Sequence, residues 1–401
     1  MTGIREYRKE KLKKEHSGKE KDIDYDKKLL IHRIRVKGIL AILIVIAVVT
    51  IVVAAIVNNA RNYSGYVIQK SMRRTDSGYA VYFDDAEGYI KCSRDGVFAY
   101  GFDNNPRWNK TYEVSKISVD KCGAYFAVAD IGSNYVYVFD EDGYISTINT
   151  VLPVVKINVS SKGHVAIILE DKEADYIDMY DKDGNRIYTI KTTAESDGIP
   201  TDIGISPDGR KLAVAFTAVK GMELKTSVVF YNFGEVGQNE NERVVGGFDF
   251  YDNQLVGEVE FLNQNTVVAV SENIISFFSI KEYPKLIRNV DIEHKIEQIF
   301  YSEEKIAYIY TDDSHKKNLC VYNTEGEILF TSEINDIYTS FEFTHKGIIM
   351  YGKDEFRLIS DNGKDKYKDR FETEISHIIP LNSNEDYLFI TIEKLHKVKL
   401  K

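Results

Sequence analysis

Cysteine is scarce in this chain of 401 residues. Its three cysteines, Cys92, Cys122 and Cys320, all lie in the long polar region that follows residue 57. Small secreted domains that depend on disulfide bonds contain far more cysteine, so this class is excluded and stability must come from a hydrophobic core. We expect unpaired, buried thiols, and a single Cys92–Cys122 bridge is the alternative.

The sequence also lacks the common motifs of catalytic and metal-binding sites. The eight histidines are scattered, without an i, i+4 pair and without a cysteine at the spacing of a zinc site. No Gly-x-Ser-x-Gly nucleophile motif and no Walker-type phosphate loop occurs. We therefore expect no catalytic residue, no cofactor and no metal ligand, and nucleotide chemistry is disfavoured.

One acidic segment, Asp181–Asn185, has the composition of the start of a calcium-binding loop. Such a loop needs a bidentate Glu at its twelfth position, where this chain has Thr192. The same kind of Gly-containing turn recurs between other apolar runs of the chain. A hairpin turn is therefore the better interpretation.

Charged residues are absent from the apolar run between Gly38 and Val57. At about 1.5 Å per residue, one helix over this run crosses the roughly 30 Å hydrocarbon core of a bilayer. The run therefore predicts a membrane anchor over residues 38–57. Residues 1–37 contain 13 Lys and Arg against 7 Asp and Glu, a net charge of +6. Because positive flanks stay inside, we expect a cytoplasmic N-terminus in the cell membrane and an extracytoplasmic C-terminal domain.

A cleaved signal peptide is the alternative interpretation of this run. Its apolar segment would be about 7 to 15 residues long and end at a small-residue cleavage site, to which Asn58–Arg61 is a poor match. An uncleaved anchor divides the chain into a basic tail (1–37), a transmembrane helix (38–57), a stalk (58–65) and an outer domain (66–401). The chain beyond residue 37 holds 39 basic and 55 acidic residues, a net charge of −16. That charge disfavours nucleic acid as a partner.

Beyond the stalk, short runs rich in Val, Ile, Tyr and Phe alternate with Gly/Asp/Asn turns, which predicts an all-β domain. Two turns recur in phase, one represented by Ser-Pro-Asp-Gly209 and the other by Asp-Lys-Asp-Gly184. A unit of about 40 residues with four strands and two hairpin turns is typical of a β-propeller blade. First strands are expected near residues 79, 116, 156, 202, 258, 298, 341 and 376.

We favour eight blades, and seven blades are the alternative because the first and last units are irregular. The last unit, from Ile378, has room for three strands. Its missing outer strand can come from Tyr66–Met72, which would close the ring.

The fourth unit is longer than the others, with extra residues between Ala215 and Tyr231 and again after Tyr231. Propellers tend to place function in such loops, because a rigid scaffold presents them. A long hairpin without a partner is the alternative. The candidate partner-binding loop comprises Tyr231, Asn232, Phe233, Gly234 and Gln238.

Five segments carry a resemblance to a known family: Trp108–Tyr112, Ser206–Gly209, Tyr231–Gly234, Val236–Gln238 and Val245–Phe248. With them, the chain resembles a family of single-pass membrane proteins from Firmicutes-type bacteria, a domain of unknown function with a quinoprotein-like or WD-repeat-like propeller. The resemblance implies an architecture and a cell-envelope location, and it supplies no activity. Quinoprotein dehydrogenases dock their blades with repeated tryptophans, whereas this chain has one, so quinone-dependent catalysis is not expected.

These features favour a membrane-anchored, non-catalytic binding or scaffold module of the bacterial cell envelope, with an envelope protein or wall polymer as partner. One alternative is a hydrolase of the cell wall. Glu258, Glu260 and Glu342 lie in or near predicted first strands, which line the channel of a propeller, and paired carboxylates can cleave glycosidic bonds. An ordinary solvated channel wall also explains them. A sensor domain that signals through the membrane anchor is a third hypothesis, and the oligomeric state stays unknown.

Overall fold

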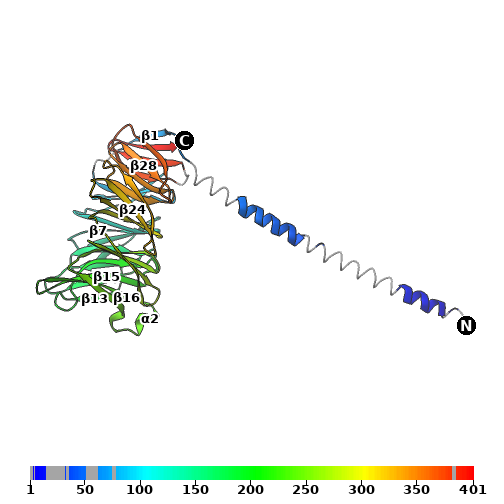
Figure 1. Ribbon diagram of the computed structural model, residues 1–401, viewed down its shortest axis with the longest axis horizontal. Helices are drawn as coiled ribbons and strands as arrows, with labels where there is room; N and C mark the ends of the chain where they lie inside the picture. Colours follow the sequence, from blue (N-terminus) through cyan, green and yellow to red (C-terminus); the bar gives the residue numbers. More distant parts are fainter. Residues whose placement is uncertain are drawn as a thin grey trace. The chain divides into compact units, whose positions relative to one another are not determined.

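The computed structural model describes residues 3, 5–14, 32, 36–50, 62–74, 78–381 and 385–401. The chain divides into two compact units, Met1–Asn62 and Tyr63–Lys401. The second unit is built almost wholly of β-strands (Figure 1).

The described parts of the first unit are helical at residues 5–14 and 36–50, and their side chains are exposed. Thr50 carries the single hydroxyl of the apolar run. This Oγ1 hydroxyl donates to the carbonyl oxygens of Ile46 and Ala47 in the preceding turn. Among the described residues, no helix has both the length and the apolar character that crossing a membrane requires. Residues 51–57 of the expected anchor and residues 58–61 of the expected stalk lie outside the described residues.

In the second unit, the described strands form eight antiparallel sheets of four strands each. We number the blades one to eight in the order of their inner strands. The inner strands are β2 (Ala80–Asp85), β6 (Ile117–Cys122), β10 (Val154–Val159), β14 (Ile199–Ile205), β18 (Val256–Asn263), β22 (Ile296–Tyr301), β26 (Ser340–Thr344) and β30 (Ile375–Pro380). The second strands are β3 (Gly88–Ser93), β7 (Tyr125–Asp130), β11 (Val165–Leu169), β15 (Lys211–Lys220), β19 (Thr266–Ser271), β23 (Lys305–Thr311), β27 (Gly347–Gly352) and β31 (Asp386–Thr391).

The third and fourth strands of each blade follow in the same order. The third strands are β4 (Gly96–Gly101), β8 (Tyr135–Asp140), β12 (Asp175–Tyr180), β16 (Glu223–Asn232), β20 (Ile274–Ile280), β24 (Lys317–Asn323), β28 (Glu355–Ile359) and β32 (Lys394–Leu400). The outer strands are β5 (Pro106–Thr111), β9 (Gly143–Asn149), β13 (Arg186–Thr192), β17 (Val244–Asp252), β21 (Pro284–Asp291), β25 (Ile328–Ile334), β29 (Asp365–Arg370) and, from the start of the domain, β1 (Tyr66–Arg73).

The ring is closed by the two ends of the domain. β1 pairs with β32, from Tyr66 opposite Leu400 to Arg73 opposite Lys394, so it supplies the outer strand of blade eight. The inner strands β2 and β30 pack against each other across the same seam. The prediction of eight blades, with Tyr66–Met72 in the outer strand of the last one, is confirmed, and the alternative of seven blades is wrong.

The core lies between neighbouring blades. Both faces of each sheet are covered, so middle strands are apolar at consecutive positions, as in Leu212–Phe216 of β15. One cluster of buried residues joins Ile168 and Ile177 of blade three to Leu212 and Val214 of blade four. Burying a large aliphatic side chain of this kind contributes about 1.5 to 3 kcal/mol, so each contact between blades contains several such contributions.

The up-and-down order of each sheet sorts its connections between two faces of the ring. Turns that join first to second and third to fourth strands lie on one face. Turns that join second to third strands, and the connections to the next blade, lie on the other. Because Tyr66 pairs with Leu400 at the end of a third strand, the chain enters the propeller on the first of these faces. We call it the entry face, and the opposite one the distal face.

Blade four carries two insertions, and they lie on opposite faces. β15 and β16 stay paired as far as Lys220 and Glu223, so the tip of their hairpin projects from the distal face. The second insertion follows Asn232 at the other end of β16, where α2 (Glu235–Gln238) and the 3-10 turn η1 (Asn241–Arg243) lie on the entry face (Figure 1). The two insertions of the fourth unit therefore do not share one face of the ring.

Candidate functional site

The wall of the central channel carries a cluster of carboxylates from several blades. Four of them interact electrostatically with one another or with the same lysine: Asp120 of β6, Asp202 of β14, and Glu258 and Glu260 of β18. That lysine is Lys156 of β10. The five side chains define the channel cluster.

A repeated backbone feature precedes three of these side chains, Lys156, Asp202 and Glu258. In five of the eight inner strands the register shifts one residue before a polar residue: Lys156, Asp202, Glu258, Gln298 and His377. A β-bulge inserts one residue and turns the strand, so the next side chain is aimed differently from that of a regular strand. The repeat of the bulge places equivalent polar side chains on equivalent parts of the wall.

Two of the carboxylates hold neighbouring inner strands together. Asp120 Oδ2 accepts a hydrogen bond of 2.5 Å from the Val159 amide of the next blade, and Asp202 Oδ2 accepts one of 2.7 Å from the Val259 amide. Asn158 Oδ1 does the same for the Ile205 amide, at 2.7 Å. Because inner strands of different blades share no ladder, these side chains satisfy amides that would otherwise be buried without an acceptor.

Charge in the channel cluster is only partly balanced. Lys156 Nζ lies 2.7 Å from Asp202 Oδ1, and the Tyr301 hydroxyl donates a 2.5 Å hydrogen bond to Glu258 Oε2. Burial nevertheless outweighs the lysine and keeps the pKa of Asp202 above its ordinary value. Burial likewise raises the pKa of Glu258.

The remaining two carboxylates of the cluster are shifted in the same direction. Burial raises the pKa of Asp120 to about 6. For Glu260, burial and then the charges of Asp120 and Asp202 raise the pKa well above the ordinary value. The cluster thus favours bound protons or the approach of positive charge.

Glu342 of β26 belongs to a second group on the channel wall. Burial, and then the charge of Asp84 on β2, raise its pKa to about 7. Lys121 Nζ donates to the Asp84 carbonyl oxygen at 2.9 Å and lies 3.4 Å from Asp84 Oδ1. Of the three glutamates expected in the channel, the structure therefore brings Glu258 and Glu260 together on one strand and places Glu342 with different neighbours.

Sequence reasoning missed three members of the channel cluster: Asp120, Lys156 and Asp202. A usable signal was present, because Lys156 and Asp202 mark the expected first strands of their units. Each is the polar residue at the same position of its repeat as Glu258. What the sequence does not show is the bulge, which decides that this position faces the channel.

The candidate partner-binding loop of blade four is largely an anchor for its insertion. Tyr231 and Asn232 are buried, and Phe233 packs edge-on against Tyr188 with ring centroids 5.1 Å apart. Asn232 Oδ1 accepts a 2.8 Å hydrogen bond from the Gly234 amide. Among the five expected residues, Gln238 alone is exposed, and it lies on the entry face. Binding of a partner by these residues stays a prediction.

The distal face contains two hollows. The larger, about 660 Å³, lies at the mouth of the channel over blades five and six, and we call it the mouth hollow. Its lining includes Lys156 and Glu258 of the channel cluster beside Leu255 and Ile296. The smaller, about 300 Å³, lies over blades three and four, and we call it the acidic hollow. Its lining combines aliphatic residues with four carboxylates, as described below.

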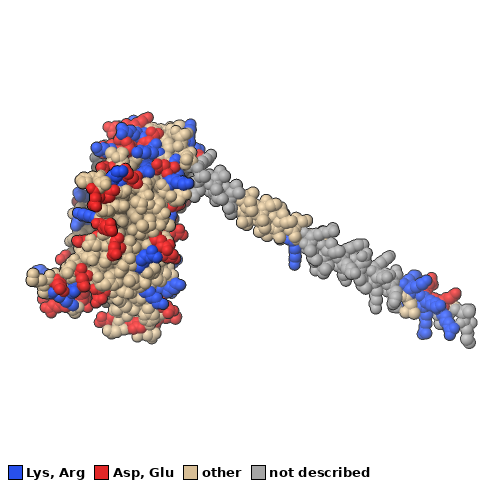
Figure 2. Space-filling model, viewed as in Figure 1, with Lys and Arg blue, Asp and Glu red and all other residues tan. Residues whose placement is uncertain are grey.

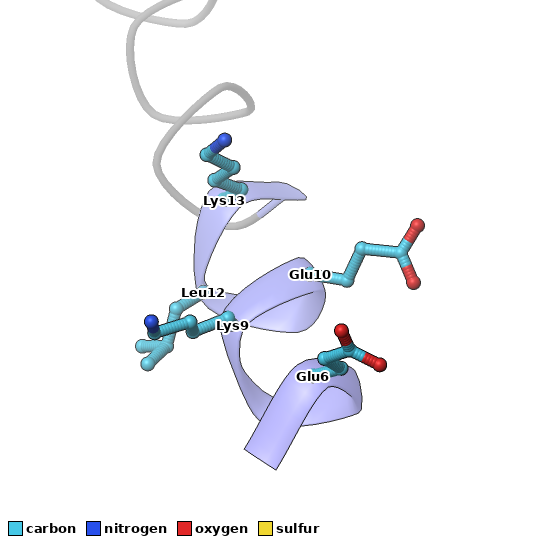
Figure 3. A pocket seen from close by; sticks show the side chains of 5 residues that line it. All are labelled: Glu6, Lys9, Glu10, Leu12 and Lys13. Atoms are coloured by element: carbon cyan, nitrogen blue, oxygen red, sulfur yellow. The ribbon is translucent and has the colours of Figure 1, made fainter. Parts of the chain in front are cut away.

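The face of the N-terminal helix drawn in Figure 3 offers no comparable site. Glu6, Lys9, Glu10, Leu12 and Lys13 all come from one exposed helix, and their side chains spread in different directions (Figure 3). Such a surface does not enclose a ligand.

The turn at Asp181–Asn185 is a hairpin turn that uses its own carboxylate. Asp181 Oδ1 accepts hydrogen bonds from the Asp183 amide at 3.0 Å and the Asn185 amide at 2.8 Å. Among the described residues, no group of His, Cys, Asp and Glu side chains is arranged to hold a metal ion.

The three cysteines are unpaired, so the alternative of a Cys92–Cys122 bridge is wrong. Cys92 and Cys320 are buried, whereas Cys122 is partly exposed. Stability therefore comes from packing rather than from a covalent link.

On the visible side of the propeller, acidic and basic side chains are interspersed (Figure 2).

Comparison with known proteins gives one family and several solved structures of similar fold. The model of a family of unknown function (DUF5711) matches residues 59–400. No curated protein matches the chain.

Solved structures with a similar fold share little sequence with the chain. BamB from Moraxella catarrhalis is 12% identical with a TM-score of 0.50, over 84% of this chain and 100% of that one. The Dos1 propeller is 12% identical with a TM-score of 0.53, over 83% and 95%. A eukaryotic initiation factor is 10% identical with a TM-score of 0.51, over 85% and 87%. At this identity the likeness shows the propeller fold alone.

Proposed function

We propose that this chain, which belongs to the DUF5711 family of unknown function, is a non-catalytic binding or scaffold module of the bacterial cell envelope. In this proposal residues 38–57 anchor it in the cell membrane with the basic tail inside. The partner is an envelope protein or wall polymer.

The proposal rests on the hollows and exposed aliphatic side chains of the distal face. Both hollows open there, and each has an exposed aliphatic side chain in its lining, Leu255 in the mouth hollow and Ile199 in the acidic hollow. Soluble proteins rarely leave such residues exposed in groups unless a partner covers them. Within the propeller, the first strand starts at the opposite face.

The proposal of a membrane anchor is supported by the sequence between Gly38 and Val57 and by the helical conformation of residues 36–50. A protease added to intact spheroplasts tests it. The propeller of the full-length chain should be cleaved while an N-terminal tag stays protected. Protection of the propeller would contradict the proposed orientation.

Binding is tested in cells that produce the full-length chain with a photo-crosslinking amino acid. The positions are Leu255 on the distal face, Gln238 on the entry face and Ile328 on an outer strand; all three are exposed. We expect a discrete adduct from Leu255 at several times the yield from Ile328. Absence of an adduct from all three positions would overturn the proposed binding function.

A wall hydrolase is the second candidate, favoured by the raised pKa values of Glu258 and Glu260, of which Glu258 lines the mouth hollow. Its test is turnover of purified wall fragments by the full-length chain. Hydrolysis that disappears in Glu260→Gln, with the fold retained, would establish this candidate in place of the binding module.

A further inference from the structure

The distal face over blades three to five carries a group of exposed aliphatic side chains. Val151 and Val155 lead into blade three, Ile199 begins blade four, and Leu255 leads into blade five. At the tip of the β15–β16 hairpin, Met222 is fully exposed. These residues occupy the same ends of neighbouring strands, and they define the aliphatic arc.

The acidic hollow joins this arc to a group of carboxylates. Its apolar lining includes Val155, Ile168, Ile199 and Pro200, which belong to the inner and second strands of blades three and four. The turn between β11 and β12 contributes the carboxylates Glu170, Asp171 and Glu173, and the first residue of β12 contributes Asp175.

The carboxylates of this turn are available to a partner. Glu170, Asp171 and Glu173 are exposed, and Lys172 is the basic residue between them. Burial, and then the charges of Glu170 and Asp171, raise the pKa of the Asp175 carboxyl. The negative potential over the hollow is therefore incompletely balanced, and a positive group placed there would be attracted.

Charge decides between the possible occupants of the hollow. An anionic lipid surface or a nucleic acid would be repelled by the carboxylates. A second copy in two-fold pairing would place the same acidic turn against itself, because such an interface uses one patch on both subunits. A protein segment with aliphatic and cationic side chains satisfies both the apolar lining and the acidic side.

We propose that the acidic hollow and the aliphatic arc bind a segment of a partner protein in which aliphatic residues lie next to Lys or Arg. This inference rests on the proposed binding function and specifies its partner. Aliphatic side chains of the segment cover Ile199 and Val155, and its cationic group lies over Glu170 and Glu173. The small size of the hollow, about 300 Å³, suits one or two side chains rather than a folded domain.

The test uses the full-length chain with the photo-crosslinking residue at Ile199. The double variant Glu170→Lys with Glu173→Lys reverses the charge beside the hollow. The matched control, Glu303→Lys with Glu304→Lys, reverses two adjacent exposed glutamates on the entry face. We expect the first variant to lower the adduct yield at least tenfold and the control to change it less than twofold. Mass spectrometry of the adduct should identify a segment that contains Lys or Arg beside aliphatic residues.

The outcomes separate this inference from the proposed function. An unchanged adduct in Glu170→Lys with Glu173→Lys, or a crosslinked segment without cationic residues, overturns the inference and leaves a binding module. Adducts from Gln238 alone likewise overturn the inference and leave a binding module. No adduct from any position overturns both. Equal melting temperatures of the two double variants establish that a loss of yield is not a loss of fold.

Discussion

Lys156 and Asp202 form an ion pair that links the inner strands of blades three and four, with Nζ 2.7 Å from Oδ1. The side chain of Asp202 is 4% exposed and that of Lys156 is 42% exposed. The other oxygen of Asp202 accepts the Val259 amide of blade five. One buried carboxylate therefore contacts two neighbouring inner strands, and its charge is met by a lysine that reaches in from the solvated channel.

Replacing this lysine should destabilise the propeller. In Lys156→Met the buried Asp202 loses its counter-charge, which costs several kcal/mol in a dry interior and about 2 kcal/mol here because the lysine is partly solvated. Chemical unfolding of the full-length chain measures the change. Lys162→Met, at an exposed lysine, is the control and should leave the midpoint unchanged. Adding Asp202→Asn to Lys156→Met should recover part of the loss, and strict additivity of the two changes would contradict a pairwise interaction.

The channel carboxylates make stability depend on pH. The folded-state pKa values of Glu342, about 7, and Asp120, about 6, lie above the ordinary values of 4.5 and 3.8. Between these values the folded chain holds protons that the unfolded chain has lost, so stability is fully present below about pH 4 and falls as pH rises through the folded pKa values.

We therefore expect a higher melting temperature at pH 5 than at pH 8, from calorimetry of the full-length chain. Glu342→Gln removes one titrating group and should flatten the profile between these two values. Glu325→Gln, at an exposed turn, should not. A profile that rises from pH 5 to pH 8 would show that the buried carboxyls are ionised in the folded chain.

Closure of the ring can be tested at two adjacent residues of β1. The Tyr66 ring lies 5.6 Å from that of Phe371 and 6.1 Å from that of Phe356, and its hydroxyl donates to the Arg370 carbonyl. Its neighbour Val67 points to the other side of the strand and is exposed.

Tyr66→Ala should lower the free energy of unfolding by about 2 to 3 kcal/mol, because it removes aromatic packing across the closure. Val67→Ala should change it by less than about 0.5 kcal/mol. Urea denaturation provides both values. Equal effects of the two substitutions would mean that the closure does not depend on this aromatic contact.

The repeat made the ring predictable from sequence. Turn glycines such as Gly184 and Gly209 adopt positive φ, as the hairpin turns require, and the recurrence of such turns between apolar runs gave the eight first strands in the correct order. The closing strand followed from counting, because the last unit was one strand short. These features depend on local residue chemistry and on spacing, and both can be read directly from the sequence.

The candidate site was less predictable because it depends on contacts between blades. Tyr231 and Asn232 looked like loop residues, yet tertiary packing buries them, and the exposed part of the insertion begins after them. The acidic hollow exists because the turn at Glu170 lies beside Ile199, which is far away in sequence. Burial and proximity of this kind arise from the arrangement of the blades and not from any single repeat.

Gly237 of α2 lies against the backbone of β16. A Cβ atom at this position would lie 1.7 Å from the Asn232 carbonyl oxygen, a distance that backbone atoms cannot accept, so Gly237→Ala must displace α2. We expect faster proteolysis between residues 232 and 244, by at least tenfold, with a small change in the melting temperature because α2 lies outside the eight sheets. Gly257→Ala is the matched control, since a Cβ there has no neighbour within 4 Å. If Gly237→Ala digests at the rate of the unsubstituted chain, the close approach of α2 to β16 is not a feature of the folded protein.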